Sequence, residues 1–292
     1  MKHLGKTVSI IIMCIIIFQG FSFTHIAHAT DDNTEFWGIV IVSLSESLHP
    51  YVYNGLMKTN NWEPSHIRLL WKNNATKENI ITAIQWLQSK ADDTDYVLLS
   101  VDAHGVYNGE EYGIWPSDGS DNGMITINEL DQEIRRINAK GICLFFDCCF
   151  SGTFATPSNS KDLKSLNYVT YKHSLSTDLS ADGRVILMST QPQALGIHWM
   201  DYNLITGEPY FEVSPSSTIS EVFEKSYDPN SDGILSAEEA YTYLQTHFRK
   251  YALKGFINIP IQLYCYLAFG RFTIPFPCIS DNFDGELPIV FL

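Results

Sequence analysis

The stretch ICLFFDCCFSG at residues 142–152 decides the fold prediction, because a buried-strand pattern ends there in a cluster of polar and reactive residues. A second apolar run, YVLLSV at 96–101, ends in the same way with DAHG at 102–105. Parallel strands place their carboxyl ends along one edge of a sheet, where ligand sites form. Cys149 and His104 are therefore expected to meet in space although they lie far apart in the chain.

Apolar runs alternate with helical patterns along most of the chain. Candidate strands occupy 37–44, 67–71, 95–101, 142–146 and 184–189. Candidate helices occupy 51–58, 76–91 with Thr76 as cap, a segment that Thr126 caps, 219–226 and 240–248. This alternation predicts the α/β class, as a three-layer αβα sandwich with a mostly parallel sheet and helices on both faces.

Composition and the first residues bear on location and partners. The chain has 292 residues, is 45% hydrophobic and carries a net charge of -14, which supports a full core and argues against nucleic-acid binding. Residues 1–29 have a basic start, a short apolar core and a small-x-small ending at Ala29, which predicts a cleaved signal peptide. The alternative is an uncleaved anchor, although the apolar core is short for a membrane span. We therefore expect a secreted or extracytoplasmic protein with no stable membrane span after signal removal.

The rest of the chain divides into two parts. Residues 30–255 are expected to form the main domain, and 256–292 an apolar extension packed on it. Five cysteines remain after signal removal, and this odd number suggests at least one free thiol. They are Cys143, Cys148, Cys149, Cys265 and Cys278. Cys149 as a reactive thiol explains the odd count, whereas the spacing leaves open whether Cys265 and Cys278 pair.

The motif residues suit covalent chemistry. A thiol needs a neighbour that takes its proton, and His104 is the best candidate because a strand precedes it and Gly105 follows it. Backbone N–H groups near Gly105 and Cys149 are expected to stabilise an oxyanion. Cys148 should point to the opposite side of the strand and pack in the core. The competing interpretations are an inert buried cysteine and a hydrogen-bonded loop histidine.

Together these residues resemble the caspase/legumain clan of cysteine peptidases, of the caspase-like or legumain-like prokaryotic type. That clan places its catalytic His in a His-Gly pair after one strand, and its catalytic Cys in Asp/Glu-x-Cys-x-Ser-Gly after the next. His104-Gly105 and residues 147–152 match these motifs, and NWEPSHIRLL and ATKENIITAIQWL add to the similarity. It covers roughly residues 36–250 in order and character, and it implies a caspase-like αβα fold.

The resemblance also carries expectations for single residues. In metacaspase-like members the acidic residue two before the Cys helps line the pocket for the residue that precedes the cut, and Asp147 matches it. A carboxylate there would favour Arg or Lys, while the alternative is an Asp that only anchors its loop. The chain departs from the pattern in two places, with DAHG in place of Ser-Gly-His-Gly and no Asn in SLSE at 43–46. No third catalytic residue is therefore carried over.

A second motif, DPNSDGILSAEE at 228–239, fits the loop of an EF-hand calcium site. Short oxygen ligands fill its first half, Gly233 permits the bend, and Glu239 can bind bidentately. The candidate ligands, with Ile234 acting through its carbonyl, are Asp228, Asn230, Asp232, Ile234, Ser236 and Glu239. The alternative is a metal-free turn with Ser236 as a helix cap. We expect a Ca²⁺ ion with a structural or regulatory role.

The functional expectation is a cysteine endopeptidase that hydrolyses polypeptide substrates with a His104/Cys149 dyad. Two alternatives stay open, namely an inactive caspase-like fold that acts as a calcium-binding interaction module, and a transpeptidase that uses the same dyad. The polar stretch 153–182 contains Lys161, Lys164 and Lys172 and is expected to be an exposed loop open to self-processing.

Overall fold

The computed structural model describes residues 33–44, 49–155, 179–192, 194–196, 199–202, 209–256 and 276–292. For 199–202, 209–213 and 248–256 it describes the backbone alone. The predicted signal peptide at 1–29, the three lysines of the polar stretch and Cys265 lie outside these residues.

A six-stranded sheet forms the centre of the molecule, with the strand order β12-β8-β7-β3-β1-β2. Five strands run parallel and β12 runs antiparallel at the edge. They are β1 (Phe36–Val42), β2 (Ile67–Trp71), β3 (Tyr96–Asp102), β7 (Gly141–Asp147), β8 (Arg184–Met188) and β12 (Cys278–Asp281). The strands β1, β3 and β7 are buried along their whole length, which explains their nearly continuous apolar sequences.

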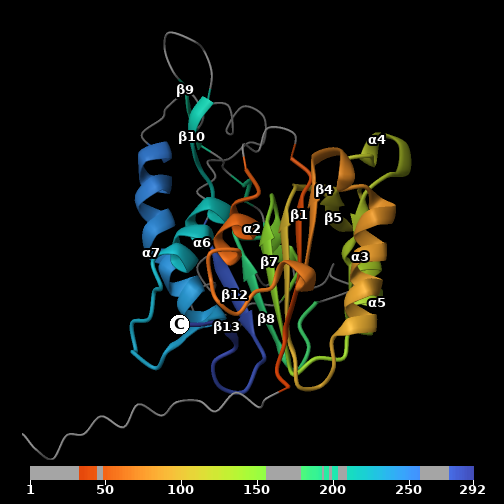
Figure 1. Cartoon of the computed structure of the whole chain (residues 1–292). Coiled ribbons are helices and arrows are strands. Elements are labelled where there is room, and N and C mark those ends of the chain that lie inside the picture. Colours follow the sequence, from red (N-terminus) through yellow and green to blue (C-terminus); the bar gives the residue numbers. More distant parts are fainter. Residues whose placement is uncertain are drawn as a thin grey trace, which may run out of the picture.

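Helices cover both faces of this sheet (Figure 1). On one side lie α3 (Lys77–Lys90) and α5 (Ile127–Ile134), and on the other α2 (Tyr51–Leu56), α6 (Pro215–Glu224) and α7 (Ala237–Phe256). The predicted three-layer αβα sandwich with a mostly parallel sheet is confirmed. Thr76 caps α3 and Thr126 forms a capping box with Glu129 on α5, as predicted. Each cap contributes about 1 kcal/mol.

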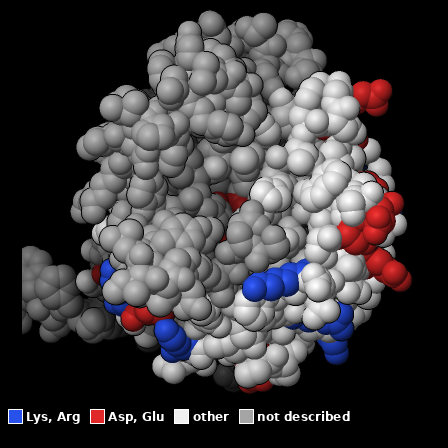
Figure 2. Space-filling view, turned by 90° about the horizontal axis from the view of Figure 1, so that it is seen from above, with Lys and Arg blue, Asp and Glu red and all other residues white. Residues whose placement is uncertain are grey.

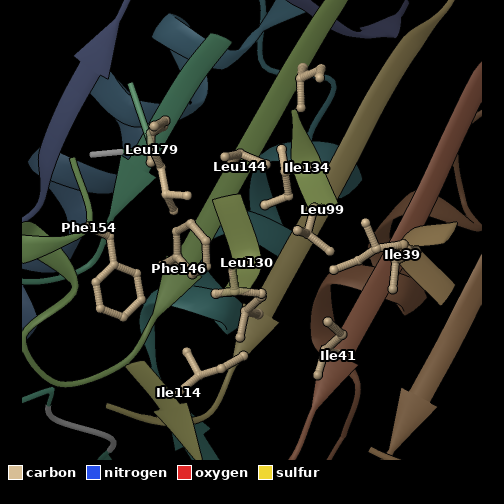
Figure 3. Close-up of a cluster of buried hydrophobic side chains, with 14 of the residues drawn as sticks. Ile39, Ile41, Leu99, Ile114, Leu130, Ile134, Leu144, Phe146, Phe154 and Leu179 are labelled. Atoms are coloured by element: carbon tan, nitrogen blue, oxygen red, sulfur yellow. The ribbon is translucent and has the colours of Figure 1, made fainter. Parts of the chain in front are cut away.

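Two hydrophobic clusters fill the space between the layers. In the first, alternate residues of the central strands, such as Ile39, Leu99 and Leu144, pack against Leu130 and Ile134 of α5 (Figure 3). The second joins the opposite faces of the strands to α2, α6 and α7. Because both clusters are continuous along the sheet, they fix the strand ends on which the candidate site lies.

Smaller elements surround the sheet. Three short sheets lie outside the central one. The first contains β4 (His104–Tyr107), β5 (Tyr112–Trp115) and β6 (Ile125–Thr126). The second pairs β9 (Trp199–Tyr202) with β10 (Pro209–Val213), and the third pairs β11 (Ile234–Ser236) with β13 (Pro288–Phe291). The short helices are α4 (Gly119–Asn122) and the 3-10 turns Pro64–His66, Lys72–Asn74 and Ser151–Thr153. Among the described residues, no helix is long and apolar enough to cross a membrane.

Candidate active site

The sheet register brings the two predicted motifs to the same edge. In the pairing of β3 with β7, Asp102 lies opposite Asp147. His104 and Cys149 therefore follow at equal distances beyond the ends of adjacent parallel strands. The N–H of Ala103 donates to the carbonyl oxygen of Asp147 at 3.2 Å, so the two segments stay together after the strands end. Figure 2 looks onto this end of the molecule and shows an acidic side chain set back near its centre.

Gly105 and Cys149 are packed backbone against backbone. A Cβ atom built on Gly105 would lie 1.7 Å from the Cys149 carbonyl oxygen, 2.7 Å from its carbonyl carbon and 3.0 Å from its nitrogen. Only glycine permits this approach. His104 is exposed and Cys149 is half-buried, so both side chains can be reached from solvent. The structure thus joins the predicted pair through the residue that follows the histidine.

Gly196 is a further site residue, which the sequence patterns did not reveal. Its backbone N–H donates to Cys149 Sγ at 3.2 Å. Ala194, in the same loop after β8, accepts a hydrogen bond from the N–H of Phe150 at 2.9 Å. A donor aimed at sulfur favours the thiolate form, which is the nucleophile. The available signal was a glycine shortly after the next parallel strand, at the same sheet edge.

Ser151 and Gly152 of the motif fasten the Cys149 segment to this loop. Ser151 is fully buried, and its hydroxyl accepts a hydrogen bond from the N–H of Thr190 at 3.0 Å. A Cβ on Gly152 would lie 2.6 Å from the nitrogen of Pro192, so glycine is required for this contact as well. Phe150 has the left-handed backbone conformation, with φ of 61°, which turns the chain directly after Cys149. The Ser-Gly pair is thus explained by packing and hydrogen bonding.

Cys148 packs in the core, as predicted from strand alternation. Burial raises the pKa of its thiol well above the usual value, and the nearby Cys149, Asp147 and Asp102 add to the rise. Burial also raises the pKa of Cys143, and it raises that of Cys278 to about 12. Cys278 is a free thiol that donates to the carbonyl oxygen of Thr190 at 3.1 Å. Cys149 is the only half-buried cysteine among the described residues; the others are buried.

Asp147 is fully buried below the Cys149 segment. Its Oδ2 accepts hydrogen bonds from both the N–H and the hydroxyl of Ser216, each at 2.8 Å. Ser216 lies in the first turn of α6, which starts after the N-cap residue Ser214. A carboxylate at a helix N-terminus is favourable. These contacts support the anchoring role for Asp147, and its role in a substrate pocket stays a prediction.

The histidine side of the site is supported by the β4–β5 hairpin. His104 pairs with Trp115 in the strand register. The hydroxyl of Ser43 donates to the carbonyl oxygen of Trp115 at 2.8 Å. The backbone N–H of Ser43 donates to the carbonyl oxygen of Asp102 at 2.9 Å. Ser43 therefore ties the end of β1 to both segments that flank His104. The stretch SLSE at 43–46, which has no Asn to orient the histidine, is described only for its first two residues, because 45–48 lie outside the described part of the chain.

The predicted calcium loop, residues 228–239, lies between α6 and α7. The carboxylate of Asp228 accepts from the N–H groups of Asp232 and Gly233 at 3.2 and 3.0 Å. The hydroxyl of Ser236 accepts from the N–H of Glu239 at 3.1 Å, so Ser236 acts as the cap of α7. Glu239 is only 7% exposed, and its Oε1 is buried without a hydrogen-bond partner. Such a buried carboxylate oxygen is an atom that a cation could bind.

The described side chains of this loop are not arranged around one point. Among the described residues, no three His, Cys, Asp or Glu side chains stand close enough together to hold a metal ion. Asp228 and Asp232 instead face backbone N–H groups, and a cation would have to draw them inward. Calcium binding by the six predicted residues therefore stays a prediction.

Comparison with known proteins agrees with this site. The family model for the metacaspase, peptidase C14 domain matches residues 49–157, which include both His104 and Cys149. No curated protein matches the chain. Protein GSU0716 from Geobacter sulfurreducens is similar at 13% identity with a TM-score of 0.45, covering 73% of this chain and 89% of that one.

A second solved structure, caspase-1 from Spodoptera frugiperda, is similar at 14% identity with a TM-score of 0.42, covering 87% of this chain and 88% of that one. The family match supports cysteine peptidase activity in general terms. The chain has an α/β fold with a mostly parallel sheet between two layers of helices, and its residues 49–157 match the model of the metacaspase, peptidase C14 domain family.

Proposed function

We propose that this protein is a secreted cysteine endopeptidase that uses a His104/Cys149 dyad. The Cys149 sulfur attacks the peptide carbonyl carbon, and His104 gives a proton to the leaving amine. Water then cleaves the thioester, releasing the acid and returning the proton to the thiol–imidazole pair. The N–H groups near Gly105 and Cys149 stabilise the oxyanion in both steps.

The contact between Gly105 and the backbone of Cys149 is the observation that carries this proposal. It holds the histidine segment against the cysteine segment without a linking side chain. The hydrogen bond from Gly196 to Cys149 Sγ supports it further, because a donor on the sulfur favours the thiolate. An inert free cysteine is usually fully buried, whereas Cys149 is half-buried and follows Asp147 as His104 follows Asp102.

We also propose a preference for Arg or Lys before the cut. Asp102 and Asp147 are buried partners in the strand register, each two residues before a member of the dyad. Two carboxylates at the base of the site make its potential negative, which favours a cationic side chain. A pair of peptides that differ only by Arg against citrulline tests this charge preference directly. Equal cleavage of the two would exclude it.

Secretion and calcium are separate parts of the proposal. Residues 1–29 have the pattern of a signal peptide. Sequencing the N-terminus of the mature protein tests secretion, because cleavage by a signal peptidase should occur directly after Ala29. The loop at 228–239 would hold Ca²⁺, through Asp228, Asn230, Asp232, Ser236, Glu239 and the carbonyl of Ile234. The orphaned Oε1 of Glu239 supports that part.

A peptide-library digest tests the peptidase function. The wild-type protein should cleave peptides, whereas folded Cys149→Ala and His104→Ala should not, and the double variant should lose no more than either single one. Adding an amine acceptor distinguishes hydrolysis from transpeptidation by the product formed. Absence of cleavage in the wild type, together with slow and equal alkylation of Cys149 and Cys148, would favour the calcium-binding interaction module instead.

A further inference from the structure

Three aromatic rings form a row beside the predicted dyad. Tyr107 of β4 stacks on Tyr112 of β5, with ring centroids 4.6 Å apart. Tyr112 in turn lies against Phe150, the residue that follows Cys149, with ring centroids 5.8 Å apart. Tyr107 is 52% exposed, the highest value among the large hydrophobic side chains of the described residues, and the other two rings are half-buried. The row therefore joins the hairpin of the histidine to the segment of the cysteine through an apolar surface that solvent can reach.

Strand alternation places the row on the face of the hairpin that contacts Cys149. Gly105 and Tyr107 lie two residues apart on β4, so they belong to the same face. Tyr112 lies opposite Tyr107 in the strand register and belongs to that face too. Gly105 packs there against the backbone of Cys149. Because two residues of a strand span about 7 Å, the row starts about 7 Å along the strand from the contact that joins the two motifs.

The hairpin side of the row is fixed by contacts within the protein. Tyr112 packs against the hydrophobic cluster that contains the central strands. The side-chain oxygen of Asn108 accepts the N–H groups of Glu110 and Glu111 at 2.9 and 2.8 Å, which closes the turn between β4 and β5. Rings that are already held in place lose little conformational entropy when a ligand packs on them.

Phe150 has an aromatic side chain at a position where the backbone disfavours one. Its φ of 61° is a conformation that bulky residues rarely adopt. The turn is held by backbone groups, since the N–H of Phe150 donates to Ala194 and its carbonyl oxygen accepts from the N–H and the hydroxyl of Thr153. Glycine or asparagine would fit this turn with less strain. The turn does not need the ring, and strain of this kind gathers at functional sites.

The proposed reaction decides which half of the substrate meets the row. His104 gives its proton to the leaving amine, so the half of the substrate that begins with this amine lies on the side of the hairpin that carries His104. An extended peptide advances about 3.4 Å per residue. A row that starts about 7 Å along the hairpin is therefore within reach of the first two residues after the cut.

We propose that Tyr107, Tyr112 and Phe150 form a subsite that selects a large aromatic or aliphatic side chain at the first or second position after the cut. Aromatic rings offer a large apolar contact area and favourable stacking geometry for such a side chain. This inference rests on the proposed peptidase function and deepens it. It is separate from the charge preference assigned to Asp147, which concerns the residue before the cut.

Peptides that differ only after the cut test the subsite. All of them share the acyl half of one peptide that the library digest shows to be cleaved. They carry Phe or Ala at the first or at the second position after the cut. We expect the wild-type protein to cleave the Phe peptide with a kcat/KM about tenfold higher than the Ala peptide at one of these positions. Because the result is a ratio within one enzyme, it does not depend on the overall level of activity.

Ring variants show whether the row causes this ratio. Tyr107→Ala removes the exposed ring and should lower the ratio to about twofold, whereas Tyr107→Phe keeps the ring and should keep the ratio. Phe150→Asn removes another ring with a residue that accepts the left-handed backbone, and it should also lower the ratio. The preference for the residue before the cut should be the same in Tyr107→Ala as in the wild type. Thermal unfolding of each variant checks that it is folded.

Four outcomes would contradict the proposal, and they differ in how far they reach. Equal cleavage of the Phe and Ala peptides by the wild type overturns the subsite alone, and so does a Phe preference that Tyr107→Ala leaves unchanged. A changed preference before the cut in Tyr107→Ala would assign the rings to the acyl half of the substrate and overturn the assignment made above. Absence of cleavage of every library peptide would refute the peptidase function, and the subsite with it.

Discussion

A methyl group at Gly105 should separate the two segments that carry the dyad. Its Cβ would lie 1.7 Å from the carbonyl oxygen of Cys149, whereas ordinary contacts start at 3.4 Å. The three nearest atoms all belong to the Cys149 backbone, so no side-chain rotation can relieve the overlap. The two backbones must therefore move apart by about 1.7 Å to reach an ordinary contact, in a region of dense packing.

This displacement sets the size of the expected effect. Moving catalytic groups by about 1 Å can cost about 100-fold in rate. Overpacking costs about 1–3 kcal/mol in the free energy of unfolding, which a domain of ordinary stability survives. We expect Gly105→Ala to remain folded and to hydrolyse peptides about 100-fold more slowly than the wild type.

Gly109→Ala is the matched control, because it lies on the same hairpin and has open space around its Cβ position. Its φ of 101° strains an alanine, so it should lose about 1–2 kcal/mol of stability without moving His104 or Cys149. Peptide hydrolysis and urea unfolding would be measured on both variants. Hydrolysis by Gly105→Ala within threefold of the wild type would refute the argument that this contact aligns the dyad.

Three further outcomes follow from the site. Iodoacetamide should modify Cys149 first and leave Cys148 unmodified in the folded protein, because burial raises the pKa of the Cys148 thiol; equal rates in peptide mass analysis would contradict this. Gly196→Pro removes the N–H donor to Cys149 Sγ and should slow alkylation at pH 7 about tenfold, whereas Gly196→Ala keeps the donor and should react nearly as the wild type does. Ser216→Ala removes one hydrogen bond to the buried Asp147 and should lower the free energy of unfolding by about 1–3 kcal/mol, and an unchanged urea midpoint would show that this bond contributes nothing.

The central sheet could be predicted from the sequence because both its faces are buried. The run 96–101 corresponds to β3, and the run 142–146 corresponds to β7. Thr76 and Thr126 cap the helices that the sequence predicted to start at these two residues. The same logic placed His104 and Cys149 at one sheet edge, since it needs only strand direction and order. The pattern of apolar residues thus predicted a strand correctly where the strand is buried along its whole length.

The rest depends on contacts that sequence patterns do not encode. The β4–β5 hairpin is short and half-exposed, so its alternation is weak, although Asn108-Gly109 marks its turn. Gly196 acts through its backbone N–H, which every residue except proline has, so its residue type does not reveal the role. The predicted calcium loop is held through β11 by β13, and this pairing joins segments far apart in the chain.

The helix α6 connects the predicted calcium loop to the sheet edge that carries the predicted catalytic residues. In its first turn, Ser216 donates two hydrogen bonds to Asp147, which lies two residues before Cys149. Its other end leads into the loop that starts at Asp228. A helix packed into the core moves as a unit, because dense interiors transmit small shifts. An ion that draws Asp228 inward would therefore act on the end of a rigid element whose opposite end supports the Cys149 segment. The two motifs that the sequence presents separately thus both adjoin α6, one through Asp147 at its first turn and the other through the loop that follows its last turn.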